Sequence, residues 1–536
     1  MANKITLLIG FILLQLSVFS QSAPFSLALE PVSISGLDGL QAFAFGQYDG
    51  KWLIMGGRLD GLHLKQPHST FDIPGHNDQL IVIDPENSQK WAAPLTPLSA
   101  SMREQLSSTN MEFYQEGDYL YCIGGYGYSA TVGDHTTYSN LTAIKVPDVI
   151  NAIINGNDYA TYFRQISDPL FQVTGGRLKK MDGNYYLMGG QKFLGRYNPM
   201  GPTHGPGFTQ VYTNAVRIFS LTDDGTTISI NHLPSYTDAA NLHRRDYNAE
   251  PQILPDGTEG LTMFSGVFQS TVDLPFLNSV TIDSAGYAVN DSFQQYYNHY
   301  HCPAIPLYSE ANNEMHTVFF GGIAQYYDNE GVLTQDNNVP FVKTIARVTR
   351  DENGKMAEYK LPVDMPALLG ASAEFIPNEN IARYDNDVFK LDEITQDSTL
   401  VGYIYGGINS SGANIFWVND GSQSSASSQV FKVYLTNNNS VGIHDLNEQS
   451  ISTLGMQVFP NPNQNHFSVK FNLKKHTSVS ISLYTIEGKL IEEKRFDNLV
   501  IGENMYQHNG DIPTGTYLVT LEVGGEKAVQ RVVVRK

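Results

Sequence analysis

Short apolar runs that end in a pair of small residues recur through most of the chain. The pairs are Gly56-Gly57, Gly124-Gly125, Gly189-Gly190, Ser265-Gly266, Gly321-Gly322 and Gly406-Gly407. The second glycines follow one another at spacings of 68, 65, 76, 56 and 85 residues. Similar segments at such a period are typical of a repeat fold, in which each repeat buries the apolar face of its neighbour.

Each repeat is predicted to form four antiparallel strands. In the first repeat an apolar stretch at 42–45 precedes a polar turn at 48–51, and the glycine-terminated run follows at once. Two further strand-forming stretches lie at 80–83 and 91–94. Four strands per repeat, six times over, predict an all-β, six-bladed β-propeller. The glycines fit strand ends that turn sharply or pack closely, where a Cβ atom would clash.

The double glycine after an apolar strand resembles the kelch repeat, over residues 36–435. The resemblance implies a kelch-like β-propeller but no particular chemistry, because propellers host many functions. The last repeat is one strand short, so we expect the spare segment 25–35 to complete the sixth blade and close the ring. The longest spacing is predicted to contain an insertion at 377–398, and a seventh blade there is the alternative.

The N-terminus carries the pattern of a secretory signal peptide. Lys4 precedes a largely apolar run from Ile5 to Phe19, and Val18 and Ser20 suit a signal-peptidase site before Gln21. We therefore assign residues 1–20 as a signal peptide. A retained membrane anchor is the alternative, although the run is short for a span. No later segment has transmembrane length, so we expect a soluble mature protein.

The last hundred residues indicate a separate domain. We place the propeller at 21–440 and, at 441–536, a linker with a small C-terminal β-sandwich, because alternating strands follow the polar link at 436–440. Its landmarks are Pro460, Asn461, Pro462, Gly488, Gly515, Tyr517 and Lys536. In this order they resemble a type A sorting domain of the type IX secretion system.

That resemblance implies recognition by the type IX secretion machinery, passage across the outer membrane and removal of the domain. Attachment to surface lipopolysaccharide, or release, would follow, so the protein is expected to be secreted or on the outer-membrane surface. A generic adhesion-type sandwich is the alternative.

Charge and cysteine content narrow the partners. Residues 1–440 hold 24 Lys and Arg against 44 Asp and Glu, which accounts for the whole formal net charge of −20. Such a surface repels nucleic acid and anionic membranes, so no nucleic-acid partner is expected. Two cysteines, Cys122 and Cys302, are too few for a disulfide scaffold, and a single bridge stays open.

One face of the predicted propeller is rich in loops. The loops between second and third strands are long, at 58–78, 126–137, 191–210, 323–339 and 408–427. Long loops on a rigid scaffold are where function collects. Eight of the 14 histidines fall on this face: His63, His68, His76, His135, His204, His243, His299 and His301.

The entries to the first strands, nearest the axis, supply candidate ligand-binding residues. They are Arg103, His243, Arg244, Arg245, Asp246, His299 and His301. The arginines would hold a carboxylate, a sulfate or sugar hydroxyls, and the histidines would donate, accept or titrate. The alternative is that the arginines latch blades together through Asp246, Glu104 and backbone carbonyls. No third ligand joins His299 and His301, so we predict no metal site and no cofactor.

The chain shows none of the common enzyme motifs, such as a nucleophile elbow, a Walker loop or a zinc-protease helix. The sequence therefore favours an exported binding protein that recognises a glycan or a protein through its loop-rich face. Two alternatives stay open. One is an extracellular carbohydrate-active enzyme with a site in the central funnel, and the other is a structural or adhesion component of the cell surface.

Overall fold

A computed structural model describes residues 24–64, 70–197, 208–329, 331–396, 398–437 and 456–535, except for 462, 465, 474, 476, 486–488, 524 and 525. One compact unit spans Phe25–Asn437, and a second contains the described residues from 456 onward. Strands dominate both units, so the prediction of an all-β fold is confirmed. Several predicted features lie outside the described residues, namely the signal peptide, His68, His204, Pro462, Gly488 and Lys536.

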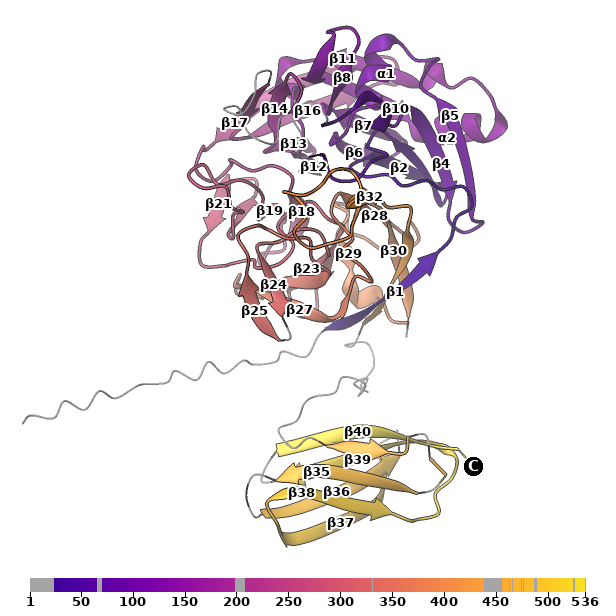
Figure 1. Ribbon diagram of the computed structural model, residues 1–536, viewed down its shortest axis with the longest axis vertical. Coiled ribbons are helices and arrows are strands. Elements are labelled where there is room, and N and C mark those ends of the chain that lie inside the picture. The colour runs from indigo at the N-terminus through magenta and orange to yellow at the C-terminus, as the bar shows by residue number, and fades with distance from the viewer. Residues whose placement is uncertain are drawn as a thin grey trace, which may run out of the picture. The chain divides into compact units, whose positions relative to one another are not determined.

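The first unit contains six sheets of consecutive antiparallel strands, which follow one another around a ring (Figure 1). The first three blades are β2 (Ala44–Tyr48), β3 (Lys51–Met55), β4 (Gln79–Asp84) and β5 (Gln89–Pro94); β6 (Glu112–Glu116), β7 (Tyr119–Ile123), β10 (Asn140–Lys145) and β11 (Phe163–Ser167); and β12 (Arg177–Met181), β13 (Asn184–Met188), β16 (Ala215–Asp223) and β17 (Ile228–Thr237). In each blade the strands pair in chain order, as the repeat pattern predicts.

The next two blades repeat this order. They are β18 (Asn248–Ile253), β19 (Glu259–Phe264), β20 (Ser279–Ile282) and β21 (Tyr287–Asn290); and β22 (Ala304–Ser309), β23 (Glu314–Phe320), β26 (Thr344–Arg350) and β27 (Met356–Asp364). The described helical segments between strands are α1 (Ala100–Leu106), α2 (Val146–Asn155), η1 (Ile73–Gly75), η2 (Ala160–Tyr162), η3 (Pro169–Phe171) and η4 (Leu391–Glu393).

The sixth blade joins the two ends of the propeller sequence. Its strands are β28 (Ala373–Pro377), β30 (Thr399–Gly406), β33 (Val430–Asn437) and, last, β1 (Phe25–Val32). β1 pairs antiparallel with β33 from Phe25 opposite Asn437 to Val32 opposite Val430. The prediction that an N-terminal strand completes the sixth blade is confirmed.

The predicted insertion connects β28 and β30 of the sixth blade and reaches the sheet of the fifth. Its short strand β29 (Phe389–Lys390) pairs in parallel with β22, with Leu307 opposite Phe389 and Tyr308 opposite Lys390. It thus extends the inner edge of the fifth sheet. The described residues hold six blades, and the alternative of a seventh blade in this stretch is wrong.

A ring of backbone hydrogen bonds encircles the propeller axis where the chain enters each first strand. One residue per blade takes part: Ala42, Asn110, Gly175, Asp246, His301 and Ser372. Each amide donates to the carbonyl of the residue in the preceding blade, and Ala42 donates to Ser372, with N···O distances of 2.7 to 3.3 Å. The ring therefore closes on itself with six members and narrows the channel at this end.

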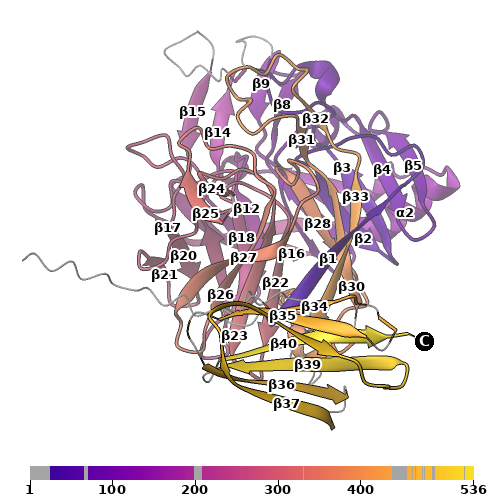
Figure 2. The same ribbon diagram turned by 60° about the horizontal axis from the view of Figure 1, so that its bottom comes forward.

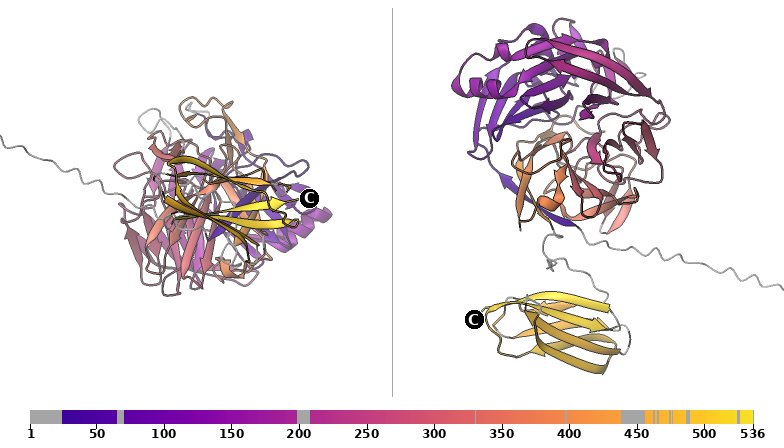
Figure 3. Two further views of the ribbon diagram at one scale, coloured as in Figure 1. Left: turned by 90° about the horizontal axis from the view of Figure 1, so that it is seen from below. Right: turned by 180° about the vertical axis from the view of Figure 1, so that it is seen from behind.

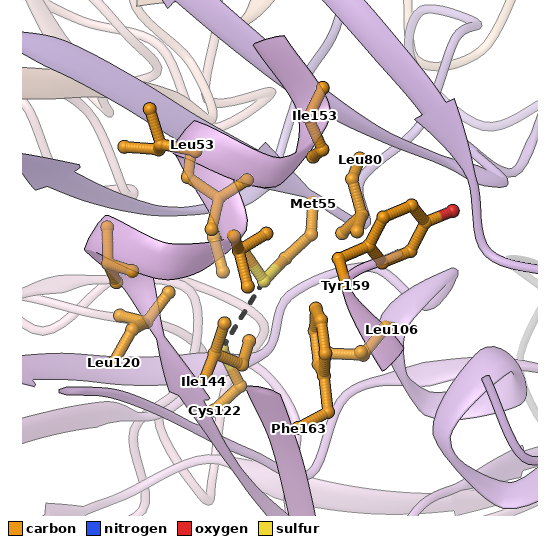
Figure 4. Packing of buried hydrophobic residues seen from close by; sticks show 14 of the residues in the cluster. Leu53, Met55, Leu80, Leu106, Leu120, Cys122, Ile144, Ile153, Tyr159 and Phe163 are labelled. Atoms are coloured by element: carbon orange, nitrogen blue, oxygen red, sulfur yellow. Dashed lines mark hydrogen bonds between the residues drawn. The ribbon is translucent and has the colours of Figure 1, made fainter. Parts of the chain in front are cut away.

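Six hydrophobic clusters fill the interfaces between consecutive blades, including the interface between the sixth and the first. Figure 4 shows the first of these, where Met55, Leu53 and Leu80 of the first blade meet Leu120 and Cys122 of the second. Burial of apolar surface at every interface stabilises the closed ring. Both cysteines are buried and free, so the alternative of a single disulfide bridge is wrong.

The paired glycines pack against the link into the next blade. Gly124 has φ +64°, and a Cβ on it would lie 2.0 Å from the carbonyl oxygen of Val173. At Gly321 the corresponding distance, to the carbonyl oxygen of Leu369, is 2.2 Å. The predicted reason for these glycines, a close backbone approach, is confirmed. In the fourth blade Ser265 takes this place, with φ +53° and its hydroxyl donating to Phe276 O.

The loops between second and third strands carry short strands of their own. From the second and third blades, β8 (Tyr126–Ser129), β9 (Asp134–Thr137), β14 (Gln191–Leu194) and β15 (Thr209–Tyr212) form one four-stranded sheet. Two hairpins are β24 (Tyr326–Asn329) with β25 (Val332–Gln335), and β31 (Ile408–Ser410) with β32 (Ser424–Ala426). Figure 2 shows β8, β9, β14, β15, β31 and β32 at the same end of the propeller, which we call the loop-rich face.

The second unit is a sandwich of two sheets (Figure 3). One sheet consists of β34 (Gln457–Phe459), β35 (Phe467–Leu473) and β38 (Gly502–His508). The other consists of β36 (Thr477–Thr485), β37 (Leu490–Leu499), β39 (Gly515–Val523) and β40 (Glu526–Val534). A single cluster of buried apolar side chains lies between them.

The described landmarks of the sorting motif hold the sandwich together. The Asn461 side chain accepts from Val533 N at 2.8 Å and donates to Arg531 O at 2.7 Å, so it ties the Pro-rich entry to the last strand. Gly515 begins β39. The buried Tyr517 donates its hydroxyl to Pro513 O at 2.7 Å.

Candidate functional site

Two adjoining cavities lie along the propeller axis. The first strands of the six blades line both of them, through Phe45, Phe113, Lys179, Glu250, Ala304 and Phe375. The outer cavity has a volume of about 370 Å³ and the inner one about 120 Å³. Consecutive residues of one strand line the inner cavity, such as Glu112 and Phe113 of β6 and Glu374 and Phe375 of β28. We call this pair of cavities the central channel.

The outer cavity lies toward the turns between first and second strands, the end opposite the loop-rich face. Gly117, in such a turn of the second blade, and Glu379, in the insertion, are exposed and line it. The insertion adds the ion pair Arg383–Asp387, with an N···O distance of 2.9 Å. It also adds Asn386, which donates to Gln252 O at 3.1 Å. The insertion thus forms one wall of the outer cavity.

The outer cavity combines aromatic faces with paired charges. Phe45 and Phe113 meet edge to face with ring centroids 5.3 Å apart, and Phe375 contacts Phe389 of the insertion at 6.2 Å. The ammonium group of Lys179 lies 3.0 Å from a Glu250 carboxylate oxygen. Such a lining offers apolar surface together with donors and acceptors of hydrogen bonds.

The inner cavity reaches the backbone ring at His301 and contains buried ionisable groups. His301 Nε2 lies 2.9 Å from Glu374 Oε1. Glu112 is 1% exposed; its Oε1 accepts from Gly176 N at 2.7 Å, and its buried Oε2 has no hydrogen-bond partner in the described structure. Burial raises the pKa of Glu112 to about 8, so its carboxyl group is protonated at neutral pH. The buried Nη2 of Arg177 likewise lacks a partner among the described residues.

Arg244, one of the predicted site residues, lies inside the fourth blade. It is fully buried, and its guanidinium donates to Asn241 O at 2.7 Å, Ser265 O at 2.6 Å and Asn278 O at 3.0 Å. It also donates to Asn278 Oδ1 and lies over the Phe276 ring. Burial lowers the pKa of Arg244 to about 9. These bonds hold the glycine turn and the following loop of one blade.

Arg245 and Asp246 form an ion pair on the loop-rich side of the backbone ring. Arg245 Nε donates to the Tyr212 hydroxyl at 3.0 Å, and the guanidinium lies 5.2 Å from the centre of the Phe268 ring. Although burial opposes it, the Tyr212 and Asp246 side chains raise the pKa of Arg245. Both residues remain partly exposed, with side-chain exposures of 13% and 24%.

His243 lies beside Arg245, whereas Arg103 lies elsewhere. The His243 ring stacks on Tyr212 with centroids 3.7 Å apart, and its Nδ1 lies 2.7 Å from Asn214 Oδ1. Burial and then the charge of Arg245 lower the pKa of His243. Arg103, on α1, donates to Leu98 O at 2.8 Å within its own link. The structure therefore groups three of the predicted residues, His243, Arg245 and Asp246.

His299 and His301, which were predicted as a pair, lie in different surroundings. His299 is fully buried, its Nε2 lies 2.8 Å from Gln295 O, and its Nδ1 accepts from Gln325 N at 3.0 Å. Burial lowers the pKa of His299 to about 4, so it is neutral. His301 instead borders the inner cavity with Glu374. In the described residues no group of three or more His, Cys, Asp or Glu side chains is arranged to hold a metal ion.

Several channel residues were not predicted from the sequence, notably Glu112, Arg177, Lys179, Glu250 and Glu374. On the first strands these charged residues alternate with apolar ones. This pattern, in strands predicted to lie nearest the axis, was the sequence signal that could have identified them. The residues that were predicted lie instead in the links before those strands.

Among the comparisons with known proteins, a family model matches the C-terminal unit, and two solved structures cover most of the chain. Residues 457–535 match the family described as secretion system C-terminal sorting domain. No curated protein matches the chain. The solved structure titled "Structure of YjhT" is 11% identical, with 76% of this chain and 99% of that chain covered and a TM-score of 0.40. A second, titled "Cryo-EM structure of RAG in complex with one melted RSS and one unmelted RSS", is 10% identical at the same coverages, with a TM-score of 0.34.

The sorting domain establishes where the protein acts. It marks a protein that the type IX secretion system exports to the cell surface or the extracellular space, as predicted. No helix within the described ranges is long and apolar enough to cross a membrane.

Proposed function

We propose that this exported protein is a saccharide-binding protein of the kelch-propeller type whose ligand enters the central channel. The observation that carries the proposal is the outer cavity of about 370 Å³, which the first strands of all six blades line. Its volume falls within the range of ordinary ligand sites, about 300–1,000 Å³.

The lining matches the chemistry of a sugar. Hydroxyl groups both donate and accept, and the cavity offers donors in Lys179 and Asn386 and acceptors in Glu250 and Asp387. The C–H faces of a sugar ring are apolar, and Phe375 offers a partly exposed aromatic face. Because the charged groups are already paired, the cavity suits a polar ligand without a large net charge.

The proposal places the ligand in the channel and not on the loop-rich face. Of the residues predicted there, Arg244 and His299 use their polar groups for bonds within one blade. Arg245 and Asp246 pair with each other. The resemblance to a type A sorting domain supports a further step after export, attachment to surface lipopolysaccharide or release.

The test is a glycan array probed with the purified protein and with Lys179→Met. Lys179 lies in the channel with 25% of its side chain exposed, so the substitution removes a donor that a ligand can reach. We expect binding to a defined class of saccharide and weaker binding by the variant. Lys51→Met, which removes a lysine exposed to a similar 26% outside the channel, serves as the control and should bind normally. Absence of any saccharide binding would refute the proposal.

A carbohydrate-active enzyme is the second candidate, favoured by Glu112. Its protonated carboxyl group is in the state that a general acid requires, and it shares the inner cavity with the Glu374 carboxylate. The bound saccharide would then be converted, and mass spectrometry of the incubated ligand would show the product. If the ligand were unchanged after long incubation, only the binding function would remain.

A further inference from the structure

We infer that the inner cavity is a subsite for the end of a saccharide chain, and that one hydroxyl group of that end binds between Arg177 and Glu112. The inference deepens the proposed function and rests on it, because it specifies which part of the ligand reaches the inner end of the channel. Three independent features support it: the position of the cavity, its size and its unpaired polar atoms.

The position of the inner cavity suits it to the end of a saccharide chain. The outer cavity lies toward the turns between first and second strands, and the inner cavity ends beside His301, a member of the backbone ring. At the ring, six consecutive N–H···O bonds of 2.7 to 3.3 Å hold the backbone around the axis and narrow the channel. A ligand that enters from the turns therefore meets the ring with its terminus and does not thread through the propeller.

The two cavities differ in size, so they accommodate different parts of the ligand. The inner cavity, of about 120 Å³, is the smaller of the two. That space suits a hydroxymethyl group or one edge of a sugar ring. The outer cavity, about three times larger at 370 Å³, is left for the body of the terminal sugar and for the next sugar of the chain.

The unpaired polar atoms of the protein favour a hydroxyl group as the part of the ligand that binds here. Arg177 Nη2 is a buried donor without a partner, and Glu112 Oε2 is a buried carboxyl oxygen without a partner, in the described part of the chain. Both side chains line the inner cavity. A buried polar group without a partner costs about 1–3 kcal/mol. A hydroxyl group can accept from Arg177 and can pair with the Glu112 carboxyl in either protonation state, so its chemistry suits both atoms.

The surrounding charges favour a neutral group over an ion. His301 lies 2.9 Å from Glu374, and Lys179 lies 3.0 Å from Glu250, so these four side chains are already paired. A carboxylate in the cavity would face the Glu374 carboxylate, and an ammonium group would face the Arg177 guanidinium. A hydroxyl group meets neither penalty.

Calorimetric titration with cellotetraose, chitotetraose, mannotetraose and xylotetraose tests the inference. Each is used with free ends and with both terminal residues O-methylated. We expect at least one free tetrasaccharide to bind, and methylation to weaken that binding tenfold or more. Equal affinity for free and methylated forms would overturn the inference and leave the proposed function intact. Failure of all four to bind would overturn the inference, and the glycan array would then decide the proposed function.

Two variants locate the subsite. Arg177→Met and Glu112→Leu, which remove the two hydrogen-bonding groups, should each weaken binding of the free tetrasaccharide about tenfold and leave the weak binding of the methylated form unchanged. Circular dichroism confirms that each variant folds, and Glu112→Leu decides the outcome if Arg177→Met does not fold. Full affinity in a folded variant would place the chain end elsewhere.

Discussion

The two sides of the backbone ring use the same kinds of residue in different ways. On the loop-rich side, Arg244 and His299 have hydrogen-bond partners within their own blades. On the channel side, Arg177 and Glu112 each keep a buried polar atom without a partner in the described structure. The contrast teaches that charge near the axis does not mark a ligand site. Buried polar atoms without a partner, on residues that line a cavity, are the better guide.

The largest effect is expected from a substitution on the loop-rich side of the backbone ring. Arg244→Met should lower the free energy of unfolding by about 3–5 kcal/mol, because it removes a buried charged donor and leaves carbonyl groups unpaired. Arg245→Met is the matched control, and it should cost less because the Arg245–Asp246 pair remains partly exposed. Urea unfolding measures both. Equal losses would show that the two neighbouring arginines have the same role.

A second prediction concerns Glu112 and the pH dependence of stability. Because burial raises its pKa to about 8, the folded protein retains a proton that the unfolded chain releases near pH 4.5. The stability that this group contributes is complete below pH 4.5 and is lost as pH rises toward 8, by up to about 1.4 kcal/mol per pH unit. Glu112→Gln cannot ionise, so its stability relative to the native protein should rise between pH 5 and 8. Parallel curves from urea unfolding would contradict the buried protonated state.

A third prediction concerns His299, with the opposite sign. Burial lowers its pKa to about 4, below the ordinary value of 6.5, so the unfolded chain takes up a proton first as pH falls. Its contribution to stability is complete above pH 6.5 and is lost between pH 6.5 and 4. His299→Gln should therefore lose less stability than the native protein over this range. Thermal unfolding across these pH values measures the difference, and identical slopes would refute the neutral buried state.

The smallest effect is expected from single aromatic side chains, and it bears on where the ligand lies. Phe375→Ala in the channel should weaken saccharide binding by about 0.5–1.5 kcal/mol, since it removes one stacking face. Trp417→Ala is the counterpart on the loop-rich face, where Trp417 is 59% exposed, and it should leave affinity unchanged. Titration of both variants with the same saccharide makes the comparison. Loss of binding in Trp417→Ala alone would move the ligand to the loops.

Much of the fold follows from local patterns. The glycine pairs predicted the blades because each first glycine meets a carbonyl of the next link, a constraint visible in sequence as a missing side chain. The closing strand at 25–32 was predicted because the last repeat lacked one. The parallel pairing of β29 with β22 was not predictable, since it depends on a contact between residues far apart in sequence.

The site was harder to predict than the fold. Arg244 and Arg245 were predicted as a pair, although one is wholly buried and the other partly exposed. Neighbouring residues on an extended segment point to opposite sides, and only the packing decides which side is the interior. Glu112 was missed because its importance lies in an unpaired oxygen, which depends on residues brought together from several blades.

The most direct test is a crystal structure of the protein with the saccharide that binds most tightly. The account predicts electron density in the central channel, with the chain end in the inner cavity and a hydroxyl group within hydrogen-bond distance of Arg177 Nη2 and Glu112 Oε2. Density on the loop-rich face beside Arg245 or Trp417, with an empty channel, would contradict it.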